Sequence, residues 1–100
     1  MSTLKRNRRP TTPGEFLKED YLKPRGIKIA EMAEAIDLST KHFSQIVNGH
    51  QRITPTTAMK VAKVLGTTSR IWLNMQAAVD AWDADQEAKN WKPKRVFEAA

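Results

Sequence analysis

The spacing of apolar residues between positions 29 and 47 constrains the fold of this chain more than any other feature. Ile29, Met32, Ala33 and Ile36 follow the i, i+3, i+4, i+7 pattern of an amphipathic helix. Asp37 follows directly, where a tight turn needs a residue that tolerates the left-handed backbone conformation. Because Ala33 is small, a second helix can cross the first one closely at this point.

A second short helix is predicted after the turn. Ser39 can cap its first turn, Phe43, Ile46 and Val47 have the spacing of an inward face, and Gly49 is a typical C-terminal stop. Two short helices joined by a tight turn form a helix-turn-helix, the motif that places its second helix in the major groove of DNA. Residues 39–49 are therefore the predicted recognition helix.

The rest of the chain predicts three more helices and no strand. Thr12 and Pro13 favour a helix from there to about Leu22, and Thr54 can cap a helix over 55–65. The last helix is expected from about residue 69 to 83 or somewhat beyond. The predicted fold class is all-α, with five short helices and the helix-turn-helix formed by the second and third.

Composition and charge suggest one domain with a basic appendage. The 100 residues are near the usual size of a single domain. We expect a flexible basic N-terminal arm over 1–12, which contains Lys5, Arg6, Arg8 and Arg9. The domain should then span 13–83, and a C-terminal tail 84–100. The formal net charge of +6 favours a polyanionic partner, either nucleic acid or an anionic membrane surface.

Several functional classes receive little support. The chain has no cysteine, and its two histidines lack the spacing of a ligand pair, so we expect neither a metal site nor a cofactor. No nucleophile motif or phosphate-binding glycine loop suggests an enzyme. No apolar run approaches the ~20 residues that cross a bilayer, so we expect no membrane association and a cytoplasmic location. RNA binding is open on charge grounds, but no aromatic stacking platform is evident.

The outward side chains of the recognition helix are short or polar, which suits contacts with DNA. Gln can pair with adenine and Lys can reach guanine, so the candidates for reading bases are Thr40, Lys41, Ser44 and Gln45. The candidates for backbone phosphate contacts are Ser39, Asn48, His50, Gln51 and Arg52. The alternative is an ordinary solvated surface. DNA is favoured because Asp and Glu are absent from 38–63.

The last predicted helix is apolar around much of its circumference. Trp72, Met75 and Val79 can fill the core of the domain, and a further apolar set then needs another partner. We expect a homodimer on a near-palindromic operator, with recognition helices roughly 34 Å apart. The alternative is a helix central to its own small core. The predicted dimer interface consists of Ile71, Leu73, Ala77, Ala78 and Ala81.

Two features at the C-terminal end remain open to two interpretations each. Asp80, Asp83, Asp85 and Glu87 form an acidic stretch, which is either a solubilising helix end or a docking site for a basic protein. The tail around Trp91 alternates basic and apolar residues. It either contacts a partner or packs on its own domain.

The chain resembles the HigA family of antitoxins, a branch of the lambda-repressor-like, XRE-type helix-turn-helix proteins. The resemblance spans roughly residues 10–82 and is carried by the motif at 13–15, by 22–26, 53–55 and 65–68, and most specifically by 72–80. It implies a homodimer that represses its own operon and neutralises an mRNA-cleaving ribonuclease toxin. Some relatives have no toxin gene beside them, so a stand-alone regulator is the alternative.

Two positions depart from the pattern of that superfamily. Ile29 stands where a glutamine often braces the DNA contacts, and Asp37 replaces the usual turn glycine. The bracing role therefore cannot be transferred to this chain.

Overall fold

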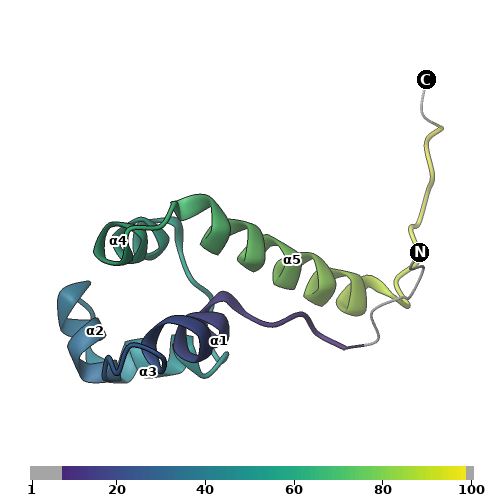
Figure 1. Ribbon diagram of the computed structural model, residues 1–100. Coiled ribbons are helices and arrows are strands. Elements are labelled where there is room, and N and C mark those ends of the chain that lie inside the picture. Colours follow the sequence, from purple (N-terminus) through teal and green to yellow (C-terminus); the bar gives the residue numbers. More distant parts are fainter. Residues whose placement is uncertain (1–7, 99–100) are drawn as a thin grey trace, which may run out of the picture.

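In a computed structural model, which describes residues 8–98, a long C-terminal helix extends from a compact group of shorter helices (Figure 1). No strand occurs within this range, so the predicted all-α fold is confirmed. None of the helices in the described part of the chain has the length and apolar character needed to cross a bilayer. The elements are α1 (Pro13–Phe16), η1 (Leu17–Leu22), α2 (Ile29–Ala35), α3 (Thr40–Val47), α4 (Pro55–Leu65) and α5 (Ser69–Ala88).

Local capping determines where several of these helices begin. Thr12 and Glu15 form a capping box, in which the Thr12 hydroxyl accepts from the Glu15 N–H at 3.1 Å and the Glu15 carboxylate accepts from the Thr12 N–H at 3.1 Å. Ser39 caps α3 and Thr54 caps α4. These predicted helix starts are confirmed.

The first predicted helix has an unexpected second half. Residues 17–22 are wound as a π-helix, with hydrogen bonds that span five residues, such as Lys23 N–H to the Lys18 carbonyl at 3.0 Å. This winding brings residues five positions apart to the same side. Leu17 and Leu22 are consequently both buried, which an α-helix would not permit as readily.

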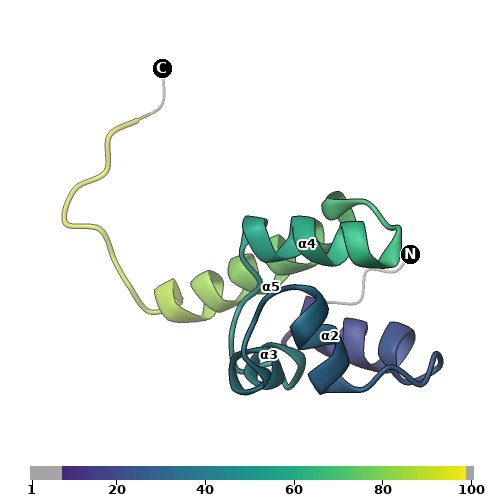
Figure 2. The same ribbon diagram turned by 90° about the vertical axis from the view of Figure 1, so that its left-hand side faces the viewer.

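The turn between α2 and α3 has the predicted geometry. Asp37 has φ of 60°, in the left-handed region. The Leu38 N–H donates to the Ala33 carbonyl at 2.9 Å, which closes the turn. Ala33 and Phe43 are buried where the two helices pack, and Figure 2 shows these helices side by side below α4.

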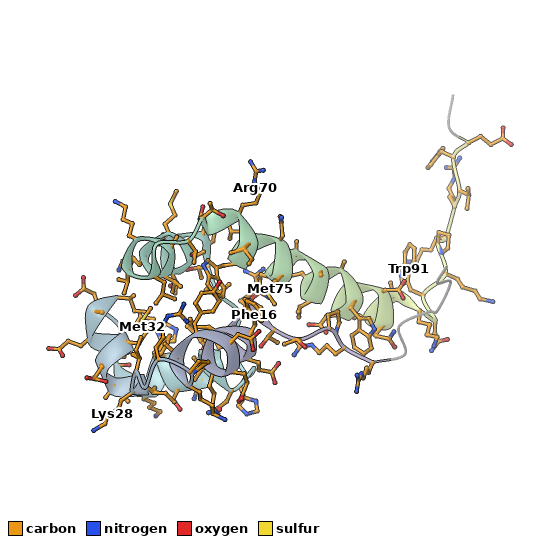
Figure 3. All side chains as sticks on the ribbon, viewed as in Figure 1. Phe16, Lys28, Met32, Arg70, Met75 and Trp91 are labelled. Carbon is orange, nitrogen blue, oxygen red and sulfur yellow. The ribbon has the colours of Figure 1, made fainter. Side chains whose placement is uncertain are left out.

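The core gathers around Trp72 of α5. Its ring lies 5.9 Å from that of Phe16 and 5.3 Å from that of Tyr21, centroid to centroid, and its indole N–H donates to the Thr67 hydroxyl at 2.9 Å. In Figure 3, Phe16, Met32 and Met75 lie in the interior, whereas Lys28 and Arg70 project outward. The aromatic cluster therefore anchors the N-terminal part of α5 to α1 and η1.

The sequence predicts a basic arm over 1–12 and a tail over 84–100. α5 continues to Ala88, past residue 83, and the segment after it projects away from the domain (Figure 1). Trp91 is 69% exposed and Phe97 76% exposed, so the tail does not pack on its own domain. At the other end, Lys5 and Arg6 of the predicted arm lie outside the described residues.

Candidate nucleic-acid interface

The exposed face of α3 carries the predicted base-reading side chains. Thr40, Lys41 and Gln45 are exposed, and Ser44 is half-buried. The surface here forms a shallow hollow of about 330 Å³, lined by Ser39, Lys41, His42, Gln45 and Gln51. The hollow thus brings together two predicted base readers and two predicted phosphate contacts.

A close backbone contact fixes the orientation of α3. A Cβ atom at Gly14 would lie 1.8 Å from the carbonyl oxygen of Ile46, so only glycine lets α1 approach α3 this closely. The inner face of α3 is fully buried at Phe43, Ile46 and Val47. The recognition helix therefore has its apolar side locked in the core and its polar side in solvent.

The segment that follows α3, residues 48–54, is held by polar contacts. Lys18 donates to the Asn48 side-chain oxygen at 3.1 Å, and the Asn48 amide nitrogen donates to the Ser44 hydroxyl at 3.3 Å. Gly49 has φ of 80°, and a Cβ there would lie 2.9 Å from the Glu15 carboxyl carbon. Residues 48–54, which we call the α3–α4 loop, therefore have a defined position relative to α1 and η1.

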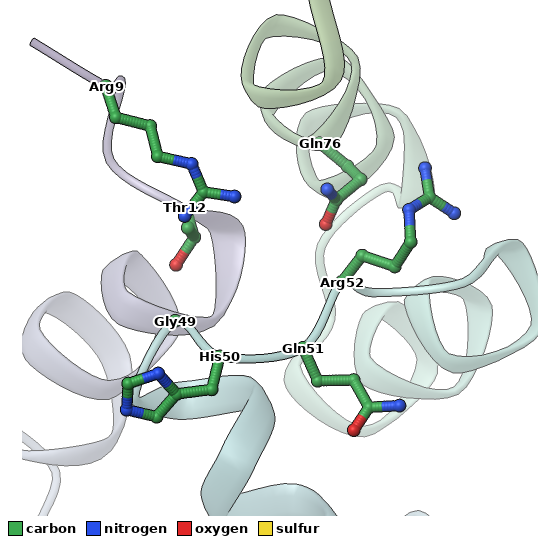
Figure 4. Close-up of a pocket in the computed structure, with 7 residues that line it drawn as sticks. All are labelled: Arg9, Thr12, Gly49, His50, Gln51, Arg52 and Gln76. Atoms are coloured by element: carbon green, nitrogen blue, oxygen red, sulfur yellow. The ribbon is translucent and has the colours of Figure 1, made fainter. Parts of the chain in front are cut away.

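The loop side chains point in different directions. In Figure 4, Gln51 points away from α5, whereas Arg52 is directed toward it. Arg52 forms an ion pair with Asp80 on α5. A contact between Arg52 and a DNA phosphate would compete with this ion pair. His50 and Gln51 are exposed in the same segment.

Two carboxylates of the acidic stretch are matched by arginines of the same chain. Arg9 forms a bidentate pair with Asp83, at 2.9 Å from Nε and 2.8 Å from one terminal nitrogen. The hydrogen bonds from Arg9 lower the pKa of Asp83, and the same pair raises the pKa of Arg9. At Asp80, burial opposes ionisation, but hydrogen bonds from Gln76 and Arg52 outweigh it, so the pKa is lowered. These two carboxylates are charged and already partnered.

Three residues on or near this face are not among the DNA-contacting residues that the sequence predicts. His42 lines the hollow, and its position directly after Lys41 on the outward face is the sequence feature that could have identified it. Lys18 contacts Asn48 across 30 residues, and Arg9 contacts Asp83 across 74 residues. No local pattern predicts either of these contacts, because they depend on how the helices pack.

The predicted dimer interface on α5 divides into two groups. Ile71 and Leu73 are half-buried and pack against the core of the same chain. Ala77, Ala78 and Ala81 are exposed farther along the helix. The described residues contain no cluster of three or more side chains suited to a metal ion.

The packed pair α2 and α3, the short turn between them and the acid-free outer face of α3 define a helix-turn-helix domain. A helix-turn-helix family model matches residues 19–73. Antitoxin HigA-1 of Vibrio cholerae is 42% identical over 93 residues, which cover 89% of this chain and 88% of that protein. An uncharacterized HTH-type transcriptional regulator of Haemophilus influenzae is 42% identical over 82 residues, which cover 82% of this chain and 77% of that protein.

A solved structure has the same fold. Antitoxin GraA in complex with its operator matches with a TM-score of 0.78 and 30% identity, covering 95% of this chain and 99% of that one. The chain belongs to the helix-turn-helix family, in the branch that contains HigA antitoxins and HTH-type transcriptional regulators. The family resemblance drawn from residues 13–15 and 72–80 is confirmed.

Proposed function

We propose that this protein is a sequence-specific, double-stranded DNA-binding repressor that serves as the antitoxin of a type II toxin-antitoxin pair and regulates its own operon. The observation that carries the proposal is the two-sided character of α3. Lys41 and Gln45 line a hollow on its outer face, and its inner face is fully buried in the core. Its similarity to antitoxin GraA, solved with its operator, supports DNA as the partner.

The arrangement of side chains suggests how DNA is bound. With α3 in the major groove, Lys41 and Gln45 lie one helical turn apart and can contact neighbouring base edges. Thr40 and Ser44 contact bases from the same face, while Ser39, His50 and Gln51 contact the phosphate backbone. Asn48 positions the cation of Lys18 beside the same loop.

We further propose a homodimer formed through α5. The exposed small side chains Ala77, Ala78 and Ala81 allow two helices to approach each other closely. A two-fold axis there would give a near-palindromic operator, with two recognition helices about one DNA turn apart.

The toxin partner is proposed to be an mRNA-cleaving ribonuclease. The similarity to antitoxin HigA-1 supports a toxin, and the family resemblance suggests its activity. Asp85, Glu87 and the exposed tail are the candidate contact surfaces, because Asp80 and Asp83 are already paired within the chain. We expect no enzymatic activity from the chain itself and a cytoplasmic location, where its DNA lies.

A mobility-shift experiment with the promoter DNA of its own gene tests the repressor function. We expect a discrete shifted complex that an unrelated duplex does not displace. Absence of a shift at low salt with folded protein in excess would refute DNA binding.

Co-purification with the product of the neighbouring gene tests the antitoxin function. Co-expression should abolish the toxicity of that product, and the two proteins should elute together. If the neighbouring product neither binds nor is toxic, the protein is a stand-alone regulator, which is the second candidate function.

A further inference from the structure

Gln76 is a buried polar residue on α5 with a distinctive set of partners. Its side chain is 4% exposed, and its oxygen accepts from the backbone N–H of Ile53 at 2.7 Å. Its amide nitrogen donates to Asp80 at 3.0 Å, and Asp80 accepts in turn from Arg52. Gln76 therefore connects α5 directly to the α3–α4 loop at Ile53 and, through Asp80 on the same helix, to Arg52.

The surroundings of this junction leave Gln76 little freedom. Figure 4 shows it extending from α5 toward the loop, beside Arg52 and opposite Arg9 and Thr12. The polar cavity that these residues share with the loop is only about 50 Å³. A buried amide must satisfy its hydrogen bonds, so Gln76 favours the loop position in which the Ile53 N–H reaches its oxygen. An apolar side chain of the same size would fill the space without specifying that position.

The geometry assigns Gln76 as a positioning residue that sets the distance between the two DNA half-sites that a dimer accepts. This inference rests on the proposed dimer that pairs through α5. The α3–α4 loop continues directly from the recognition helix, and Gln76 fixes that loop to the dimerising helix. Each base pair added between half-sites shifts one of them by about 3.4 Å and rotates it by roughly a tenth of a turn. A rigid junction therefore rejects operators with altered spacing.

Binding to spacing variants of the operator tests the assignment. The full chain first selects duplexes from a random library, which yields its half-site sequence and preferred spacing. Binding is then measured on that duplex, on duplexes with one base pair inserted or removed between half-sites, and on one with a wrong base in a half-site. The variants are Gln76→Met and, as a matched control, Gln86→Met on the exposed side of the same helix.

We expect the wild type and Gln86→Met to lose at least ~10-fold in affinity on altered spacing, and Gln76→Met to lose under ~3-fold. The penalty for the wrong base should be the same in all three proteins. Exchange of the Ile53 amide hydrogen, followed by NMR, should be faster in Gln76→Met because its acceptor is gone. A spacing penalty in Gln76→Met equal to that of the wild type would overturn the inference.

A second variant covers the case in which Gln76→Met does not fold. Asp80→Asn keeps an oxygen for Gln76 but removes the ion pair with Arg52, and it lies at a partly exposed position. It should relax the spacing penalty in the same direction, by a smaller factor, and an unchanged penalty would count against the inference. If the wild type selects no DNA sequence, the proposed function fails. If it selects a fixed spacing that both variants retain, only the role of Gln76 fails.

Discussion

At the scale of single residues, Gly14 and Gln45 lie on opposite sides of α3 and are expected to have different roles. Glycine at position 14 allows a backbone contact that larger residues forbid, and this contact holds the buried side of the helix. Gln45 lies on the opposite, exposed side, at the edge of the hollow. We expect Gly14 to contribute to stability and, under the proposed function, Gln45 to contribute to specificity, so their substitutions should have separable effects.

Gly14→Ala should destabilise the fold by about 3 kcal/mol, because the new methyl group would overlap the carbonyl of Ile46 and force α1 away from α3. Chemical denaturation measures this change. Gly26→Ala is the matched control: it adds the same methyl group where no atom lies within 4 Å and so costs only the strain of a positive φ, about 1 kcal/mol. Equal losses in both variants would contradict the close-packing explanation.

Gln45→Ala should relax discrimination at one base pair of each half-site by ~1 to 3 kcal/mol and leave the other positions unchanged. Affinities for a set of operator duplexes, each with one altered base pair, measure this effect. Gln86→Ala on α5 serves as the control and should bind every duplex as the wild type does. A uniform loss across all duplexes would instead assign Gln45 to a phosphate contact.

At the scale of the elements, α5 has a buried side and an exposed side. Trp72 and Val79 are fully buried, whereas Ala77, Ala78 and Ala81 are exposed, and Asp80 and Asp83 pair with Arg52 and Arg9. Changes at the exposed positions should therefore affect association or local ion pairs more than folding.

Ala78→Glu should weaken the proposed dimer by at least ~10-fold, since a two-fold axis would bring the two new carboxylates together. Sedimentation velocity over a range of concentrations measures dissociation, and circular dichroism checks that the monomer stays folded. Ala35→Glu, an exposed alanine on α2, is the control and should associate as the wild type does. A dimer unaffected by Ala78→Glu would place the interface elsewhere.

Asp83→Asn should flatten the acid limb of the stability profile. Arg9 lowers the pKa of Asp83 in the folded state. A carboxylate with a lowered folded pKa stabilises the protein above its unfolded pKa of about 3.9, and this contribution disappears as the pH falls through the folded value. Thermal melting as a function of pH should therefore show a shallower loss below about pH 4 in the variant. Arg9→Gln should show the same flattening, and wild-type slopes in both would exclude the pair as a contributor.

The elements also show which parts of the fold the sequence predicts. The caps at Thr12, Ser39 and Thr54 and the left-handed turn at Asp37 depend on neighbouring residues only, and all four were predicted. The π-helical winding of η1 was not predicted; it accompanies the burial of Leu17 and Leu22 in the core, which involves distant parts of the chain. The pairs that involve Arg9 and Arg52 link distant parts of the chain, so spacing rules contain no information about them.

At the scale of the whole molecule, the charge distribution and the proposed two-fold symmetry would both favour DNA binding. No acidic residue lies between positions 38 and 79, a range that includes α3, the α3–α4 loop and α4. The carboxylates that follow at Asp80 and Asp83 are matched by arginines of the same chain. A dimer would present two such surfaces to one DNA duplex, and each would add its own phosphate contacts.

The salt dependence of operator binding tests this central claim most directly. If each copy contacts about four to six phosphates, a dimer should show a slope of log affinity against log salt of about −7 to −11. The same titration on a scrambled duplex should give much weaker binding at every salt concentration. A slope near half this range would indicate that a monomer binds, and equal affinity for both duplexes would contradict sequence recognition by α3.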